Sequence, residues 1–117
     1  SNLPEAYAAM GLSYFIWGKL DEASASSRKA IELDPDDFIA YWTLGRIHFT
    51  NGELEQALGP FKRVIELKPG FYAAYADLAQ TCAGLGRHEE AELASRQLLD
   101  LLPNYLLQNP DEARARM

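Results

Sequence analysis

The sequence predicts an all-α fold, a right-handed α-solenoid built from three helical hairpins and completed by a short C-terminal helix. The first observation behind this prediction is a 34-residue internal period, marked by the prolines Pro35, Pro69 and Pro103. Each of them follows a similar short segment that contains isoleucine or leucine at the same positions. The second is a column of glycines at the same interval: Gly18, Gly52 and Gly86. The third is the helical spacing of the apolar residues between these markers. A constant period of this length indicates stacked copies of one supersecondary unit.

Each repeat unit is predicted to hold two helices. The units span residues 4–37, 38–71 and 72–105, and together they make one domain. Aligned on the prolines, they share columns of aromatic, apolar and small residues: Tyr7, Tyr41 and Tyr75; Met10, Leu44 and Leu78; Gly11, Gly45 and Ala79; Ala23, Ala57 and Ala91. From these columns we predict helices near residues 4–17, 21–33, 38–51, 54–67, 72–84 and 88–101. The apolar faces of the hairpins are expected to be buried by stacking on one another.

The first unit shows how local chemistry defines a hairpin. Tyr7, Met10 and Tyr14 lie at helical spacing and form one stripe. Gly18 is expected to end that helix, because glycine adopts the left-handed conformation at a helix C-terminus with little steric cost. Acidic residues suited to a helix N-terminus follow directly. Pro35 is expected to stop the second helix, because proline lacks the N–H and disfavours a helical residue before it.

Among the positions that depart from the repeat pattern, three bear on packing or on helix geometry. Ser27 and Ser95 stand where the second unit has Phe61, so the first and third hairpins are predicted to be packed more loosely than the second. Pro60 falls inside the second helix of the second unit. Because proline removes one backbone hydrogen bond there, we predict a local bend or a lengthened hydrogen bond at this place.

The two ends of the chain break the period. Residues 106–117 are interpreted as the end of an insert, which begins at Asn104, and the start of a seventh helix near 110–117. This helix would be either a cap or the beginning of a fourth unit, and the chain would then be a piece of a longer protein. The helix is expected to pack on the last hairpin and to cover part of Leu93, Leu98 and Leu102. Residues 1–3 are either a vector-derived addition or a natural start.

The repeated residues resemble those of the tetratricopeptide repeat (TPR) family. An aromatic residue, a Leu-Gly pair, a second glycine, an alanine and a closing proline recur in the order that this family shows. The second unit carries the closest match, in Tyr41, Leu44, Gly45, Gly52, Ala57, Phe61, Val64 and Pro69. The resemblance covers residues 4–105 and rests on three units in tandem. It implies a scaffold for protein–protein interaction, with neither catalytic activity nor a cofactor.

Composition and charge restrict the classes of function. Of the 117 residues, 48% are hydrophobic, which is enough to bury a core. The formal net charge of -6 disfavours nucleic acid as a ligand, because an acidic surface repels phosphates. No apolar run approaches the roughly 18 residues of a membrane span, and no signal peptide is evident. A single cysteine makes a reducing cytoplasm the expected location.

The sequence holds no pattern typical of an enzyme or a metal site. His48 is interpreted as a packing residue between helices, since a histidine without a motif is poor evidence of catalysis. Cys82 is interpreted as a small buried residue, since nothing beside it would activate a nucleophile. The acidic stretch at residues 34–37 lacks the spaced ligands of a calcium loop. We expect Asp36 or Asp37 to cap the following helix instead.

The resemblance implies that the first helix of each hairpin lines a concave groove, in which extended peptides or helices bind. Carried over unit by unit, the groove residues are Leu12, Phe15, Ile16, Ile39, Trp42, Arg46, Phe49, Ala76 and Gln80. The first two units are strongly apolar here, and an exposed apolar patch usually indicates a partner. We therefore predict that an apolar peptide or an amphipathic helix binds in the groove. Its anchors would be Trp42, Phe49 and Phe15, and Arg46 would orient it.

Two alternatives to this prediction remain open. The domain could be a self-association module, whose apolar patch or C-terminal end pairs with another copy. It could also be the regulatory repeat array of a larger protein with an enzymatic part elsewhere. One subtype of the family is disfavoured, in which a clamp of basic and amide side chains holds the C-terminal carboxylate of chaperone tails. The matching positions here hold no cation: Ala8, Leu12, Thr43, Ala73 and Asp77.

Overall fold

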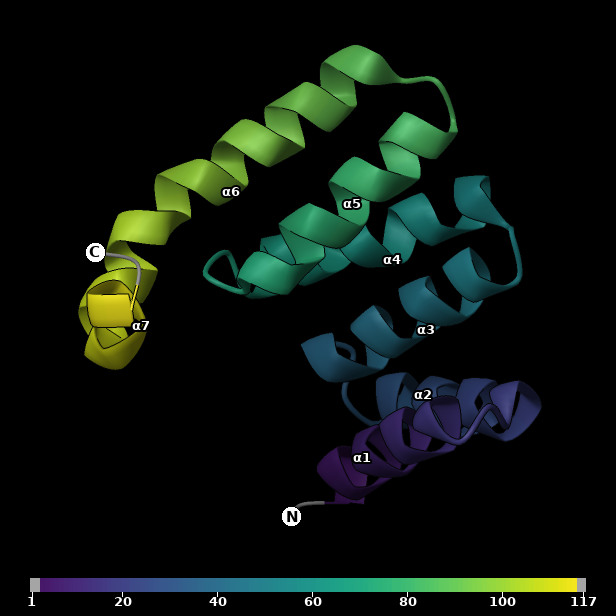
Figure 1. Ribbon diagram of the computed structural model, residues 1–117. Helices are drawn as coiled ribbons and strands as arrows, with labels where there is room; N and C mark the ends of the chain where they lie inside the picture. Colours follow the sequence, from purple (N-terminus) through teal and green to yellow (C-terminus); the bar gives the residue numbers. More distant parts are fainter. Residues whose placement is uncertain (1–2, 116–117) are drawn as a thin grey trace.

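The computed structural model describes residues 3–115, and within this range it holds seven α-helices and no strand. The helices are α1 (Leu3–Ile16), α2 (Leu20–Leu33), α3 (Phe38–Thr50), α4 (Leu54–Leu67), α5 (Tyr72–Gly84), α6 (His88–Gln108) and α7 (Pro110–Ala115). Figure 1 shows α1 to α6 as three pairs, each closed by a short turn and stacked in chain order, with α7 at the end of α6. The predicted all-α solenoid with a short C-terminal helix is confirmed. Ser1 and Asn2, on which the interpretation of the N-terminal end rests, lie outside the described residues.

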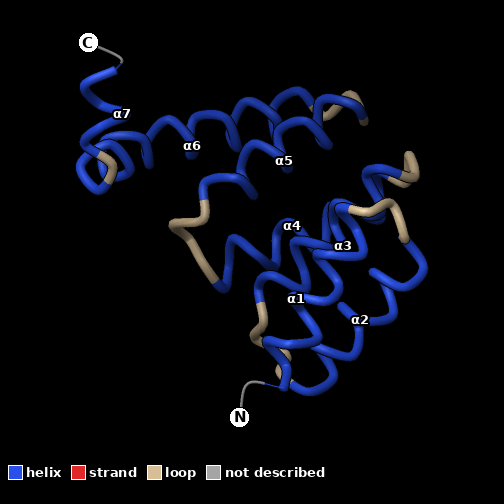
Figure 2. Tube along the Cα trace, turned by 60° about the horizontal axis from the view of Figure 1, so that its bottom comes forward, coloured by secondary structure: helices blue, strands red, loops and turns tan. Residues whose placement is uncertain are grey.

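The first helix of each later hairpin packs against both helices of the hairpin before it. Helix α3 contacts both helices of the first hairpin, α1 and α2, and α5 contacts both α3 and α4. The tube in Figure 2 shows the resulting row of hairpins from another side. The radius of gyration is 15.0 Å, above the roughly 13 Å expected for a compact domain of this length. The described part of the chain is therefore elongated, as stacking in one direction requires.

The turn inside each hairpin depends on a glycine. Gly18, Gly52 and Gly86 have φ angles of 78°, 76° and 77°, in the left-handed region that residues with a side chain rarely adopt. At the second turn, the Gly52 N–H donates to the Phe49 carbonyl at 3.0 Å and so closes the end of α3. The prediction that these glycines end the first helices of the hairpins is confirmed.

An aspartate caps the helix that begins the second hairpin. Asp37 precedes α3, and its Oδ1 accepts a hydrogen bond from the Ala40 N–H at 3.2 Å. Burial raises the pKa of this carboxyl, although the Ala40 hydrogen bond opposes the shift. Within the same acidic stretch, Asp34 Oδ1 accepts from the Asp36 N–H at 3.0 Å. The expected capping role is therefore confirmed for Asp37.

Replacing Asp37 with alanine should lower the free energy of unfolding by about 1 kcal/mol, because the Ala40 N–H loses its acceptor at the start of α3. Asp37→Asn should have a much smaller effect. The asparagine oxygen can accept the same hydrogen bond without placing a charge where burial disfavours one. Urea unfolding followed by circular dichroism measures both values. Equal losses for the two variants would contradict a capping role for the side-chain oxygen.

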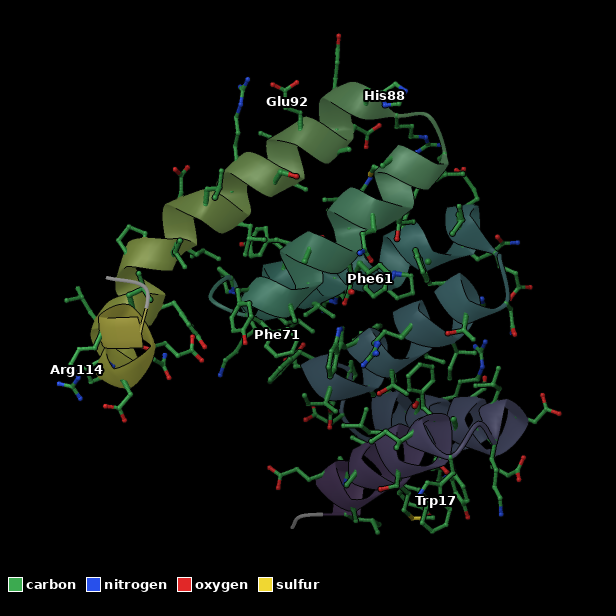
Figure 3. All side chains as sticks on the ribbon, in the orientation of Figure 1. Trp17, Phe61, Phe71, His88, Glu92 and Arg114 are labelled. Atoms are coloured by element: carbon green, nitrogen blue, oxygen red, sulfur yellow. The ribbon has the colours of Figure 1, made fainter. Side chains whose placement is uncertain are left out.

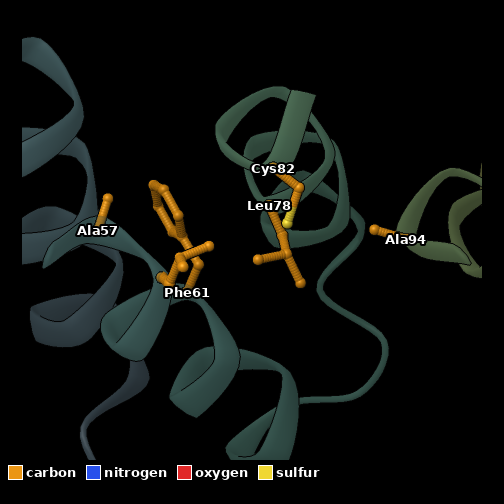
Figure 4. Close-up of a cluster of buried hydrophobic side chains, with 6 residues drawn as sticks. Ala57, Phe61, Leu78, Cys82 and Ala94 are labelled. Atoms are coloured by element: carbon orange, nitrogen blue, oxygen red, sulfur yellow. The ribbon is translucent and has the colours of Figure 1, made fainter. Parts of the chain in front are cut away.

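The largest core cluster joins the second and third hairpins. It consists of buried residues from α4, α5 and α6: Ala57, Leu58, Phe61, Leu78, Cys82 and Ala94. Figure 4 shows the Phe61 ring reaching from α4 and Leu78 from α5 into the space between these helices. Phe61 is 1% exposed and is the largest fully buried side chain of the described residues. A Cβ added at Gly45 would lie 2.6 Å from the Phe61 ring, so α3 and α4 pack closely because Gly45 has no side chain.

The first hairpin is packed closely although it lacks a residue of that size. Ser27 is fully buried at 0% exposure. A Cβ added at Gly11 would lie 3.2 Å from the Ala23 carbonyl oxygen and would overlap the Ser27 hydroxyl. The prediction of looser packing is therefore wrong for this hairpin, because α1 and α2 lie closer together where the bulky ring is absent. The Ser27 hydroxyl is buried without a hydrogen-bond partner among the residues described, whereas Ser95 in the third hairpin is exposed.

Helix α6 continues through Pro103 to Gln108. The predictions that this proline ends the helix and that residues 104–109 form an insert are therefore wrong. Proline removes one backbone hydrogen bond, but it does not prevent a helix where the following residues favour one. All three prolines are followed directly by a residue that favours turns, Asp36, Gly70 or Asn104, so the residue after the proline does not explain why only α6 continues. Helix α4 likewise continues through Pro60, and the bend expected there stays a prediction.

A ring contact holds the last turns of α6 against the start of α5. The ring centroids of Tyr72 and Tyr105 are 4.9 Å apart in an edge-on arrangement. A hydrogen bond with the Glu112 carboxylate of α7 raises the pKa of Tyr105 to about 12, and burial and Tyr72 act in the same direction. One repeat earlier, Phe38 and Phe71 make the corresponding contact at 5.3 Å. The two repeats therefore make the same ring contact, although Tyr105 lies within α6 and Phe71 lies just before α5.

Helix α7 begins at Pro110, where the sequence predicts it, and residues 116–117 of the predicted helix lie outside the described range. It contacts α6 and no other helix of the part that the structure describes. Its Glu112 lines a pocket with Leu98 and Leu102, but Leu93 is 56% exposed. The expected cover over Leu93 is therefore wrong, because the longer α6 carries α7 away from α5.

Candidate protein-binding face

Helices α1, α3 and α5 lie side by side, and their side that carries the predicted groove residues is called the groove face here (Figure 1). A pocket of about 250 Å³ opens on it, lined by Phe15, Arg46, Phe49, Thr50, Phe61, Asp77 and Gln80. Four of the predicted groove residues meet in this pocket: Phe15, Arg46, Phe49 and Gln80. The other five are not part of its lining: Leu12, Ile16, Ile39, Trp42 and Ala76.

Arg46 joins the first two hairpins. Its guanidinium carbon lies 4.9 Å from the ring centroid of Phe15 on α1 and 4.9 Å from that of Trp42, one turn earlier on α3. A guanidinium beside two aromatic rings makes favourable cation–π contacts. Arg46 is half-buried and lines the pocket, so the two rings hold the one cation of the pocket lining in place.

Trp42 links the second hairpin to the third. Its indole N–H donates to Asp77 Oδ2 on α5 at 2.7 Å. Its ring meets Phe71 edge-on, with the centroids 5.1 Å apart, and Figure 3 shows Phe71 close to the start of α5. Trp42 is half-buried, and its only hydrogen-bond donor on the side chain is already engaged. In the predicted role as an anchor, it can therefore offer a ligand only the exposed part of its ring.

The predicted groove residues differ in how much surface they offer to a partner. Ile16 is 70% exposed and Phe49 is 37% exposed, and Gln80 is exposed as well. Three others are half-buried: Leu12, Ile39 and Ala76. Ile39 packs against a buried alanine cluster between the first two hairpins, so it also stabilises their contact. Ile16 and Phe49 are therefore the main free apolar side chains among the predicted residues.

Besides the four predicted groove residues, the pocket lining holds three more residues: Thr50, at the end of α3, Phe61 and Asp77. Phe61 belongs to α4, and its ring lines the pocket because Gly45 on α3 has no side chain in its path. Asp77 is one of the positions at which the carboxylate clamp lacks a cation, and in the structure it accepts the Trp42 indole N–H. In the sequence, the column of small residues that includes Gly45 is the signal that could have indicated that the Phe61 ring reaches the pocket.

The residues considered for catalysis or metal binding occupy structural positions. Cys82 is 1% exposed, and burial raises the pKa of its thiol, which disfavours the thiolate that a nucleophile needs. His48 Nδ1 lies 3.1 Å from Glu53 Oε1 across the turn after α3. Over residues 3–115, no group of three or more potential metal ligands comes together. In the same range, no helix combines the length and the apolar character needed to cross a membrane.

Comparison with protein families decides the classification. A family model for the TPR repeat matches residues 11–52, and a tetratricopeptide repeat model matches residues 39–71 and 72–105. The chain belongs to the tetratricopeptide repeat family. TPR proteins are generally non-enzymatic scaffolds for interactions between proteins, and the TPR repeats of this chain support that general role. Among curated proteins, no match to this TPR chain was found.

Solved structures share the TPR fold. A crystal structure of MamA has a TM-score of 0.79 and 26% identity, covering 97% of this chain and 61% of the MamA chain. A second crystal structure of MamA has a TM-score of 0.78 and 28% identity, covering 84% of this chain and 54% of that one. This TPR chain thus spans between 54% and 61% of the length of these two MamA chains.

The second TPR of Spaghetti (RPAP3), bound to the HSP90 peptide SRMEEVD, is a further structural neighbour. Its TM-score is 0.80, and the match covers 85% of this chain and 92% of that one. Because the identity is 19%, this likeness shows the fold alone.

Proposed function

We propose that this TPR chain binds an apolar peptide or an amphipathic helix of a partner protein on its groove face. The observation that carries the proposal is the pocket between α1, α3 and α5, with the exposed ring of Phe49 in its lining. Ile16, which follows Phe15 of the pocket, adds a second exposed apolar side chain. Exposed apolar side chains beside a pocket favour a partner that covers them.

The size of the pocket favours a protein ligand over a small molecule. Its volume of about 250 Å³ is below the roughly 300–1,000 Å³ of small-molecule sites. A single bulky side chain of a partner suits a space of this kind. An amphipathic helix presents such side chains along one stripe, so one anchor could enter the pocket while the next covers Ile16.

The charges of the pocket favour a ligand that is not strongly acidic. Arg46 and Asp77 both line it, so one cation and one anion face the ligand. The peptide in the Spaghetti structure, SRMEEVD, has acidic residues near its C-terminal end. The positions of this chain that match a carboxylate clamp hold no cation. We therefore propose a ligand with an apolar stripe, oriented by one polar contact to Arg46, rather than an acidic chaperone tail.

Selection from a displayed library of random peptides tests the proposal. Peptides enriched on the wild-type chain should carry an apolar stripe at helical spacing. Their affinity for the double variant Ile16→Glu, Phe49→Glu should fall about 30-fold or more, since the loss of anchor contacts at an interface typically amounts to 2 kcal/mol or more. Fluorescence anisotropy of a labelled enriched peptide measures the loss. Trp42 is left unchanged because it also holds the hairpins together.

The matched control is the double variant Leu33→Glu, Leu93→Glu. It introduces the same charges at apolar side chains that are 41% and 56% exposed, on α2 and α6 rather than on the groove face. Peptide affinity should be unchanged in this variant, and circular dichroism should show the helix content of the wild type in both. Equal affinity for the wild type and the groove variant, or a selection that enriches no peptide, would contradict the proposed function.

A further inference from the structure

We propose that copies of this chain stack end to end, with α1 of one copy seated on the α5–α6 hairpin of the next. These two surfaces lie at opposite ends of the solenoid (Figure 1). Figure 3 shows Trp17, directly after α1, at one end and Glu92 of α6 at the other. Neither surface is the groove face, and the internal repeat indicates what each of them accepts.

The outer face of α1 corresponds to faces that α3 and α5 bury. A shallow pocket of about 340 Å³ on α1 is lined by Ala6, Ala9, Met10, Ser13, Tyr14 and Trp17. One repeat later, four of the corresponding residues are buried: Ala40, Thr43, Leu44 and Ile47. Two repeats later, four are buried again: Ala74, Leu78, Thr81 and Cys82. The stripe on α1 is open, with Met10 44% and Trp17 73% exposed, so no helix among the described residues covers it.

The other end of the solenoid carries the matching surface, which lies on the α5–α6 hairpin around Leu99 and is called the seat here. Ile31 on α2 and Ile65 on α4 each pack into a core cluster that includes buried residues of the next hairpin. Leu99 takes the corresponding position on α6 and is 64% exposed. It lines a pocket of about 440 Å³ with Tyr72, Leu98, Leu102, Tyr105 and Glu112. At this repeat position, Ile31 and Ile65 each pack against the hairpin that follows, whereas Leu99 is exposed.

The next helix, α7, borders this seat through Glu112 but leaves Leu99 exposed. Helix α6 runs on to Gln108, and α7 then contacts α6 without contacting α5. In the first two hairpins, by contrast, the following helix contacts both helices of the hairpin. The long α6 therefore leaves the third hairpin accessible to a helix from outside the chain.

Charges across the existing junctions indicate which helix fits. Two ion pairs join the second hairpin to the third. Arg87 Nη2 lies 2.8 Å from Glu55 Oε1. Lys62 Nζ lies 3.8 Å from Glu90 Oε2. These pairs fix the register of one hairpin on the next, because each partner must lie opposite a charge of the other sign.

A junction between two copies would repeat both ion pairs. By the 34-residue correspondence, Lys19 of the incoming copy takes the place of Arg87 and faces Glu89 of the other copy. Likewise, Glu22 of the incoming copy faces Arg96. Both pairs join opposite charges, as they do between the second and third hairpins. A second copy of this chain therefore matches the seat in shape and in charge.

This match is not a general result of the repeat. At the junction of the first and second hairpins, the positions of the first pair hold Asp21 and Glu53, which are both acidic. The positions of the second pair hold Arg28 and Gln56, which cannot form an ion pair. The two ends of the chain thus match each other better in charge than its first two hairpins do. Because the two copies contribute different surfaces, the contact is heterologous and can continue from copy to copy.

Sedimentation velocity across a dilution series of the chain tests this inference. The mass of the wild type should grow with concentration and should pass beyond a dimer. Met10→Glu disables the α1 face and Leu99→Glu disables the seat, so each variant alone should stay monomeric. An equimolar mixture of the two should form a dimer that grows no further, since the mixture retains one intact face and one intact seat. Both side chains are exposed, and circular dichroism verifies that the fold is kept.

The ion pairs are tested by exchanging their charges. Lys19→Glu should weaken association roughly fivefold, and combining it with Glu89→Lys should restore the wild-type value. Ala25→Glu introduces a negative charge at an exposed position of α2 that belongs to neither surface, and it should leave association unchanged. Failure of the double exchange to restore association would overturn the proposed register.

A wild type that stays monomeric at every concentration overturns the inference and assigns both ends to other occupants, such as further repeats or a different protein. Association of either Met10→Glu or Leu99→Glu alone at wild-type strength also overturns it, because that result requires another contact. All of these variants leave the groove face unchanged. Failure here is therefore distinguishable from failure of the proposed peptide binding.

Discussion

Replacing Phe61 with alanine is expected to lower the free energy of unfolding by about 3–5 kcal/mol. The ring is 1% exposed and fills the space between α3, α4 and α5, so its removal leaves a cavity that the helices can close only in part. Domains of this size have a total stability of about 5–15 kcal/mol. The substitution should therefore remove a large fraction of the stability and loosen the contact between the second and third hairpins.

Urea unfolding of the Phe61→Ala variant measures this loss from the midpoint and slope of the transition. Phe49→Ala is the matched control, since it removes the same ring from a position that is 37% exposed. We expect that control to lower the free energy of unfolding by less than about 1 kcal/mol. Similar losses for the two variants would contradict the central place of Phe61 in the core.

Replacing Gly45 with alanine should lower the free energy of unfolding by about 1–3 kcal/mol, although alanine is the better helix former. The new Cβ would lie 2.6 Å from the ring of Phe61, which is 1% exposed and packs in the largest core cluster. Either the ring leaves its preferred rotamer or α3 moves away from α4. Both changes disturb the same core cluster, so thermal and urea unfolding should report the loss together.

Gly59→Ala is the matched control for this substitution. Gly59 also lies inside a helix, α4, but a Cβ added there meets nothing within 4 Å apart from its neighbours in the chain. We expect it to change the free energy of unfolding by less than about 0.5 kcal/mol, because the normal gain from replacing a helical glycine is opposed by the clash of the new Cβ with the ring of the following Pro60. In the Phe61→Ala background, Gly45→Ala should change sign and become stabilising, because the ring that it meets is gone. A Gly45→Ala loss that is independent of Phe61 would contradict the steric account.

The fold is largely predictable from the sequence because its determinants are local and repeated. The glycine that ends each first helix and the aspartate that caps α3 act within a few residues of their own positions. Pro103 is the exception, since the sequence around it resembles the helix ends at Pro35 and Pro69. The ring contact between Tyr72 and Tyr105 has its counterpart one repeat earlier in Phe38 and Phe71, so what differs is the contact of Tyr105 with Glu112 of α7. Such a contact is not visible in local spacing.

The candidate site is predictable in position but not in detail. The resemblance to the TPR family implies which side of α1, α3 and α5 carries the groove residues, and four of them line one pocket. The hydrogen bond between Trp42 and Asp77 joins residues on different helices, and its geometry depends on how the hairpins stack. The same stacking brings the Phe61 ring from α4 into the pocket. The sequence pattern predicts which residues share a face of a helix, but it does not give the distances between helices on which these contacts depend.

The side chains that line the pocket also set the bend of the superhelix. Contacts run from Phe15 in the first hairpin through Arg46 and Trp42 in the second to Asp77 in the third. In a solenoid, the small rotation between neighbouring repeats determines the curvature, and these contacts lie across both junctions. If a ligand draws Arg46 from the Phe15 ring, the contact between the first two hairpins is weakened. We therefore expect occupancy of the pocket to change the curvature of the superhelix.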